Sequence, residues 1–151
     1  MKFMLDTNIC IYLIKRQSEK IIENLKKHTA GEIGISSITL AELQYGVAKS
    51  QHMKQNRIAL EEFVLPLEIA SFDEKAAETY GIIRSQLEKT GNPIGSLDTL
   101  IGAHALSRGV TLVTNNIREF KRIKSLRAFL MIWIFWGDNF DNGFFSRIKI
   151  F

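Results

Sequence analysis

The sequence contains little that could cross-link the chain or leave it disordered. Its 151 residues include one cysteine and two prolines, and 24% are charged, so an intramolecular disulfide is excluded and the signature of disorder is absent. The lone thiol, Cys10, lies among apolar neighbours, which is typical of a buried residue in a reducing compartment. With 46% apolar residues, the chain can form one compact domain on its own core.

Long hydrophobic runs are missing too. The most apolar stretch, residues 128–136, is well short of the roughly 20 residues of a membrane-spanning helix. The first residues lack the apolar segment and cleavage site of a secretory signal. We therefore expect a cytoplasmic protein without membrane association. The net charge of +4 slightly favours polyanionic partners.

Several common catalytic motifs are also absent. No G-x-S-x-G, C-x-x-C, P-loop or G-x-G-x-x-G sequence occurs, which argues against serine hydrolases, zinc ribbons, P-loop NTPases and dinucleotide enzymes. The three histidines, His28, His52 and His104, are scattered without metal-ligand spacing, and His104 fits a packed helix residue. Chemistry based on acidic residues and a metal ion remains.

Short apolar runs alternate with helical patterns along the chain. Strands are expected at 2–5, 33–35, 67–70 and 110–113, and helices at 9–16, 18–28, 38–49, 52–64, 74–89 and 97–107, the last ending at Gly109. This order predicts a single-domain α/β fold with a central, mostly parallel sheet flanked by helices on both faces. Sites in such folds gather at the carboxyl ends of strands, where Asp6 and Asn116 would lie.

Acidic residues in apolar surroundings are the candidates for chemistry: Asp6, Glu42, Asp98 and Glu119. Glu42 and Asp98 have no cation one helical turn away on their own helices, so burying them is costly unless a divalent ion binds them. Hard cations such as Mg²⁺ accept widely spaced carboxylates as ligands, so no tight local motif is needed.

Structural interpretations of Asp6 and Glu42 compete with this one. Asp6 could cap the helix that begins near Asn8, and Glu42 could complete a capping box with Thr39.

The other two acids have similar alternatives. Asp98 could simply favour the first turn of its helix, with Ser96 as the cap, and Glu119 could form a surface ion pair with Arg122.

Four sequence blocks favour the interpretation of these acids as site residues. They are Met4-Leu5-Asp6-Thr7-Asn8, then Ser37 to Gly46, then Asp98 to Ala103, and then Val113 to Phe120. Their combination and order resemble the VapC toxins of the PIN-domain ribonuclease family. The resemblance covers residues 1–127 and leaves 128–151 as an apolar extension, compatible with an edge strand, a dimer contact or an altered reading frame.

The resemblance implies an endoribonuclease that uses Mg²⁺ or Mn²⁺. It implies Asp6, Glu42 and Asp98 as metal ligands and catalytic residues. Because Asn116 stands where many relatives carry aspartate, the fourth acid is either supplied by Glu119, the residue we expect, or replaced by an amide. Thr7, Asn8, Ser96 and Asn116 would orient the carboxylates or contact phosphate; as turn and cap residues they have an equally good structural explanation.

The resemblance also implies partners. A VapB-type antitoxin would block the site, the chain would form a homodimer and a hetero-oligomer, and DNA would be contacted only through the antitoxin. The expected substrate is tRNA, above all the anticodon loop of initiator tRNA. A basic set could bind the RNA backbone: Lys15, Arg16, Lys20, Lys26, Lys27, Lys121, Arg122, Lys124 and Arg127. A non-catalytic RNA-binding PIN module and a DNA-directed nuclease remain as alternatives.

Overall fold

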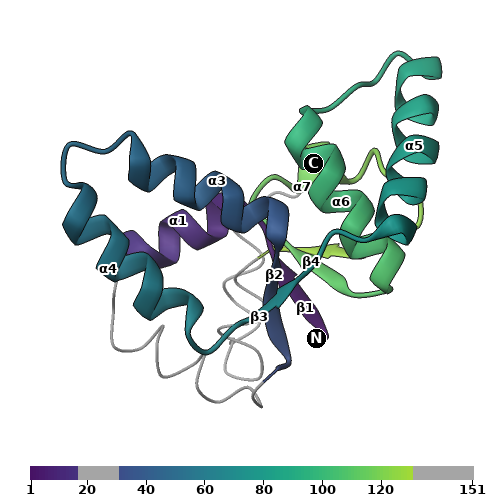
Figure 1. Ribbon diagram of the computed structural model, residues 1–151. Coiled ribbons are helices and arrows are strands. Elements are labelled where there is room, and N and C mark those ends of the chain that lie inside the picture. The colour runs from purple at the N-terminus through teal and green to yellow at the C-terminus, as the bar shows by residue number, and fades with distance from the viewer. Residues whose placement is uncertain (17–30, 131–151) are drawn as a thin grey trace, which may run out of the picture.

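A five-stranded parallel sheet forms the centre of the protein (Figure 1). The computed structural model describes residues 1–16 and 31–130. The strands β1 (Phe3–Leu5), β2 (Ile33–Ser36), β3 (Glu68–Ala70), β4 (Thr111–Val113) and β5 (Ala128–Phe129) lie in the order β3-β2-β1-β4-β5. All four pairings are parallel, so the predicted α/β architecture is confirmed and the described sheet is parallel throughout.

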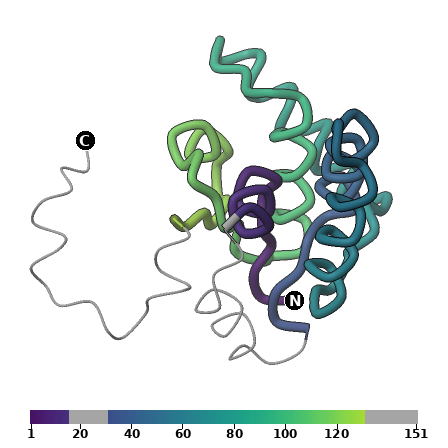
Figure 2. Tube along the Cα trace, turned by 90° about the vertical axis from the view of Figure 1, so that its left-hand side faces the viewer, coloured from purple at the N-terminus to yellow at the C-terminus, as the bar shows by residue number. Residues whose placement is uncertain are grey.

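Helices cover both faces of the sheet. They are α1 (Thr7–Arg16), α3 (Ser37–Ala48), α4 (Met53–Val64), α5 (Glu74–Lys89), α6 (Ser96–Arg108) and α7 (Ile117–Phe120). In Figure 1, α1, α3 and α4 lie on one side of the strands and α5, α6 and α7 on the other. Figure 2 shows the purple turns of α1 beside α3 and α4.

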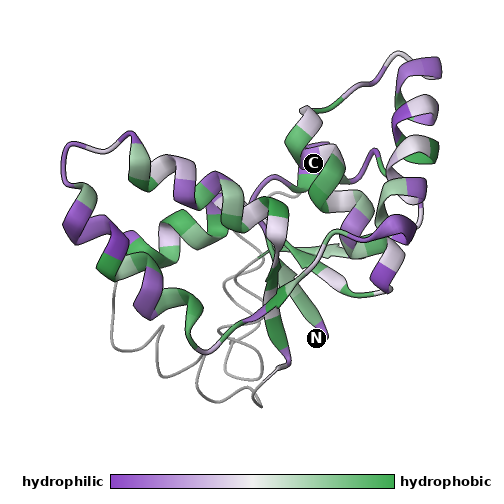
Figure 3. Cartoon of the chain, viewed as in Figure 1, coloured by the Kyte–Doolittle hydropathy of each residue, from purple (hydrophilic) through white to green (hydrophobic). Residues whose placement is uncertain are grey.

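The alternation of side chains along each strand explains the two layers. Met4 and Leu112 pack with α5 and α6, whereas their neighbours Leu5 and Val113 pack with α1, α3 and α4. All four are fully buried. The strands buried on both faces are mostly apolar, as expected for a parallel sheet, and polar colours gather on the outer helices in Figure 3.

Local signals set several helix boundaries. The Ser36 hydroxyl accepts a hydrogen bond from the Ile38 N–H and caps α3, and Asp73 does the same for the Ala76 N–H of α5. Gly109 ends α6 at φ 65°, a left-handed conformation that favours glycine, as predicted.

The expected helices and strands that fall on described residues lie at or near their predicted positions. The helix expected at 18–28 lies outside the described residues, as do residues 131–151 of the apolar extension. The extension begins as the edge strand β5. Cys10 and His104 are fully buried, as predicted. No helix among the described residues has the length and apolarity needed to cross a membrane.

Candidate active site

Asp6 lies at the carboxyl end of β1 and is only 2% exposed. Its backbone N–H donates to the Val113 carbonyl at 3.0 Å, which joins the ends of β1 and β4. One carboxylate oxygen accepts the Ile9 N–H at 2.7 Å, and the other accepts the Thr114 hydroxyl at 2.5 Å. Asp6 therefore caps α1, and its second oxygen is held at the end of β4.

Thr114 is a residue of this site that the sequence reasoning missed. It is fully buried, and its hydroxyl accepts the Asn116 N–H at 2.8 Å while it donates to Asp6. The available signal was its position directly after β4, the strand beside β1. Asn116, which was expected to act through its side chain, takes part here through its backbone.

Glu42 lies on α3 and is held by α1. The hydroxyl of Thr7 donates to a Glu42 carboxylate oxygen at 2.5 Å, across 35 positions of sequence. The capping-box interpretation with Thr39 is wrong, because Ser36 caps α3 and Thr39 is a buried residue within the helix. Thr7 thus contacts a carboxylate, as its predicted supporting role requires.

Asp98 is half-buried in the first turn of α6. Gly95 precedes the helix and no side chain caps it, so the expected cap at Ser96 is wrong. Burial, and then the negative charges of Glu119, Asp6 and Glu42, raise the pKa of Asp98 from its ordinary 3.8 to about 6.

Glu119 lies on α7 and is partly buried. The surface ion pair expected with Arg122 is not what the structure shows, because the Arg122 guanidinium donates to the Pro93 carbonyl at 3.0 Å. Glu119 is instead the charge with the largest effect on Asp98. Asn8 and Ser96 are exposed, and the described contacts join neither side chain to a carboxylate.

Electrostatics show that the four predicted acids share one region. Burial raises the pKa of Asp6, the hydrogen bonds from Thr114 and Ile9 lower it, and the charge of Glu42 raises it again. Among the residues that the structure describes, no cation is a cause of the pKa shift of Asp6 or Asp98. Carboxylates that repel one another without a counter-charge are an energetic cost that a bound cation would remove.

The donor set fits a hard divalent cation. Among the described residues, no three His, Cys, Asp or Glu side chains already stand in ligand geometry. Mg²⁺ needs only one or two protein carboxylates, keeps several waters and also binds substrate phosphate, so an open arrangement of oxygen donors suits it better than a closed protein cage.

Two arginines of the predicted basic set form hydrogen bonds to backbone carbonyls within the protein. Arg122 binds the Pro93 carbonyl, and Arg127 donates to the carbonyl of Gly109. Lys15, Lys121 and Lys124 are exposed, as RNA-backbone contacts would require. The side chain of Arg16 and residues Lys20, Lys26 and Lys27 lie outside the described residues.

Comparison with known proteins identifies the family of this chain. The model of the PIN domain family matches residues 3–126. The chain belongs to the PIN-domain family. It is 49% identical over 127 residues to "Ribonuclease VapC2" of Rickettsia felis, covering 83% of this chain and 95% of that protein. It is 45% identical over 128 residues to "tRNA(fMet)-specific endonuclease VapC" of Shigella flexneri, covering 85% and 96%.

Solved structures of VapC proteins agree with this assignment. The chain matches the structure of DNA-bound VapBC from Salmonella typhimurium with a TM-score of 0.81 and 46% identity, covering 85% of this chain and 97% of that one. For VapBC2 from Rickettsia felis, bound to a fragment of its promoter, the TM-score is 0.79 at 47% identity, covering 86% and 98%. Within the PIN domains, this protein therefore belongs with the VapC ribonuclease toxins, as the sequence blocks predicted.

Proposed function

We propose that this VapC ribonuclease is an Mg²⁺- or Mn²⁺-dependent endonuclease that cuts initiator tRNA in the anticodon loop and so inhibits translation. The observation that carries the proposal is the convergence of four carboxylates, one of them with its pKa raised to about 6, with no balancing cation in the part of the chain that the structure describes. Two relatives named tRNA(fMet)-specific endonuclease, at 45% and 46% identity, support the choice of substrate.

In this proposal Asp6, Glu42 and Asp98 hold the metal ion. Thr114 and the Ile9 N–H fix the orientation of Asp6, and Thr7 fixes that of Glu42.

The proposed chemistry is hydrolysis of a phosphodiester bond. When bound, the ion supplies positive charge that activates a water and offsets the charge developing on the phosphate. Glu119 lies beside Asp98 and completes the acidic set in place of an aspartate at position 116. Attack in line with the leaving 3′-oxygen gives products with 5′-phosphate and 3′-hydroxyl ends.

A VapB-type antitoxin is the proposed regulatory partner. Homologous VapC proteins have been solved as VapBC complexes, including those from Rickettsia felis and Salmonella typhimurium on DNA. We infer that this chain likewise forms a homodimer and a hetero-oligomer with its antitoxin, and reaches DNA only through that partner.

Cleavage of total bacterial tRNA by the purified, antitoxin-free protein tests the proposal. Reactions contain Mg²⁺ or Mn²⁺, with EDTA as one control, Asp6→Asn as a second and Glu78→Gln as a matched variant. Glu78 is an exposed acid on α5 outside the acidic set. The expected result is discrete cuts in initiator tRNA, lost with EDTA and Asp6→Asn but kept in Glu78→Gln.

Other outcomes distinguish the alternatives. Folded protein that binds tRNA without cutting it would indicate the non-catalytic RNA-binding module. Preferential cutting of single-stranded DNA competitors would indicate the DNA-directed nuclease.

A further inference from the structure

An exposed tyrosine and lysine continue the face of α3 that carries Glu42. In a helix of 3.6 residues per turn, positions 38, 42, 45 and 49 lie along one side. Ile38, at the start of this stripe, packs against the core formed with α5 and α6, and Glu42, one turn further on, accepts the hydrogen bond from Thr7 of α1. Tyr45 and Lys49 therefore extend from the acidic site along α3.

The ring of Tyr45 is open to a ligand. Tyr45 is 66% exposed, so most of its large apolar ring is not used in the core. The Lys49 ammonium lies 4.7 Å from the ring centroid, a cation–π contact that holds the ring and leaves area for another planar group. Among the described residues, Lys49 has no acidic partner, so the pair is positively charged.

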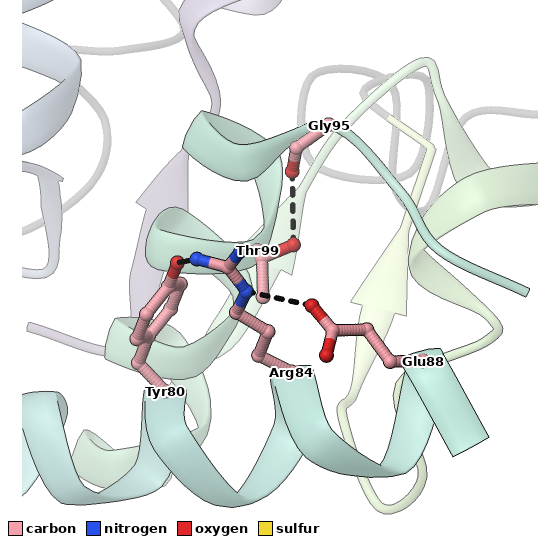
Figure 4. A network of polar contacts seen from close by, with 5 residues as sticks. All are labelled: Tyr80, Arg84, Glu88, Gly95 and Thr99. Atoms are coloured by element: carbon pink, nitrogen blue, oxygen red, sulfur yellow. Dashed lines mark hydrogen bonds and ion pairs between the residues drawn. The ribbon is translucent and has the colours of Figure 1, made fainter.

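A second tyrosine–cation pair, Tyr80 and Arg84, differs from the Tyr45 pair in its exposure and in its charge. Arg84 lies 5.9 Å from the Tyr80 ring centroid, but its guanidinium also pairs with Glu88 at 2.9 Å and donates to the Tyr80 hydroxyl at 2.8 Å (Figure 4). Its charge is thus neutralised, and Tyr80 is partly buried beside α6. Of these two pairs, the Tyr45 pair alone combines an open ring with an unbalanced positive charge.

We propose that Tyr45 and Lys49 form a nucleotide subsite, in which the Tyr45 ring stacks on an unpaired RNA base next to the bond to be cut and Lys49 binds a neighbouring phosphate. Single-stranded nucleic acid is commonly held by an aromatic platform with a cation that follows the backbone. Tyr45 lies about 4.5 Å along the helix axis from Glu42, and Lys49 about 6 Å further. The spacing places one base and one phosphate beside the metal ligands.

The charge favours RNA over a protein partner on this stripe. Lysine is depleted at the cores of protein interfaces, whereas an exposed lysine without an acidic partner is what phosphate binding requires. The inference rests on the proposed function, because it assumes that the substrate is an RNA with unpaired bases, such as an anticodon loop.

Binding without cleavage tests the subsite. Fluorescence anisotropy with labelled anticodon stem-loop RNA in EDTA gives the Kd of the wild-type chain and of Tyr45→Ala, Tyr45→Phe and Tyr80→Ala. We expect Tyr45→Ala to weaken binding by about 5- to 150-fold, the range for loss of one stacked base. Tyr45→Phe keeps the ring and should bind as the wild type does, as should Tyr80→Ala, the matched tyrosine on α5.

The salt dependence of binding tests the lysine separately. Lys49→Gln should reduce the slope of log K against log salt by about 0.7, the value for one phosphate contact on a single strand. In tRNA cleavage with Mg²⁺, the Tyr45→Ala change should raise KM and leave kcat close to that of the wild type, because the ring binds a flanking base and not the reacting phosphate.

Three results would overturn the subsite. The first is wild-type RNA affinity in folded Tyr45→Ala, and the second is a loss of RNA affinity in Tyr45→Phe equal to that in Tyr45→Ala. The third is a Tyr45→Ala variant that keeps its RNA affinity but binds a VapB-type antitoxin more weakly, which would make the stripe a protein-docking face. Failure of the proposed function looks different, because the wild-type chain itself would then leave tRNA intact with Mg²⁺.

Discussion

The hydrogen bond from Thr114 to Asp6 gives the sharpest test of how the site is built. Thr114→Val replaces the hydroxyl by a methyl group of similar size, so packing is kept while the bond at 2.5 Å is lost. Both residues are buried, so water cannot replace the donor. A hydrogen bond to a charged group contributes about 1.5–3 kcal/mol, and the Asn116 N–H loses its acceptor as well.

The expected change is a loss of about 1.5–3 kcal/mol in the free energy of unfolding near neutral pH. The sign of its pH dependence follows from Asp6. The bond from Thr114 lowers the pKa of Asp6, so its removal raises that pKa, and the penalty shrinks in acid where Asp6 is protonated. The affinity for Mg²⁺ should fall as well, because the carboxylate loses both orientation and charge.

Urea unfolding and calorimetric titration with Mg²⁺ measure the two effects. Thr114→Ser keeps the hydroxyl and serves as the control. Wild-type stability and wild-type Mg²⁺ affinity in Thr114→Val would refute the reasoning, because a buried carboxylate would then have lost its donor without consequence.

Three further predictions follow from pKa shifts and packing. Mg²⁺ affinity, measured by calorimetry, should fall as the pH drops through about 6, where Asp98 gains its proton, and Asp98→Asn should remove this dependence. Burial, and then the charge of Arg108, lower the pKa of His104, so the stability contributed by the neutral imidazole is lost as the pH falls below about 6.5, the ordinary histidine value. Urea unfolding in the Asp98→Asn background should show this loss of stability. A free energy of unfolding that does not change with pH would contradict it. Gly102→Ala would bring its Cβ against the side chain of Ile123, which is buried and has little room to move, and should cost about 1–3 kcal/mol. Gly46→Ala meets nothing within 4 Å and should stabilise α3 by about 0.5–1 kcal/mol. Thermal unfolding compares the two variants, and equal effects would refute the packing argument.

Much of the fold was predictable because its signals are local. The strand before Asp6 and the strand before Thr114 are apolar runs that end in polar residues, and parallel strands bring such ends to one edge of a sheet. The glycine that ends α6 also acts through its own backbone conformation.

The contacts within the site depend on chain segments far apart in sequence. Thr7 meets Glu42 across 35 positions, and Asp6 meets Thr114 across 108, so no local pattern could select these partners. The capping box proposed at Glu42 is absent because α3 begins earlier, with Ser36 as its cap, and Glu42 instead accepts the hydrogen bond from Thr7.

Tertiary packing also separates two residues, Glu119 and Arg122, whose spacing in the sequence would allow an ion pair. An ion pair between Arg122 and Glu119 was one of two interpretations of Glu119, but the turn before α6 lies close enough for Arg122 to bind the Pro93 carbonyl instead. That packing leaves Glu119 to act on Asp98, which the sequence alone could not show.

The Mg²⁺ dependence of single-turnover cleavage of initiator tRNA tests the central claim most directly. The account predicts that the wild-type rate rises with Mg²⁺ to a plateau, that EDTA abolishes cleavage, and that Asp98→Asn requires much more Mg²⁺ to cut at the same position. Cleavage that persists in EDTA, or an Asp98→Asn variant with the wild-type Mg²⁺ dependence, would contradict it.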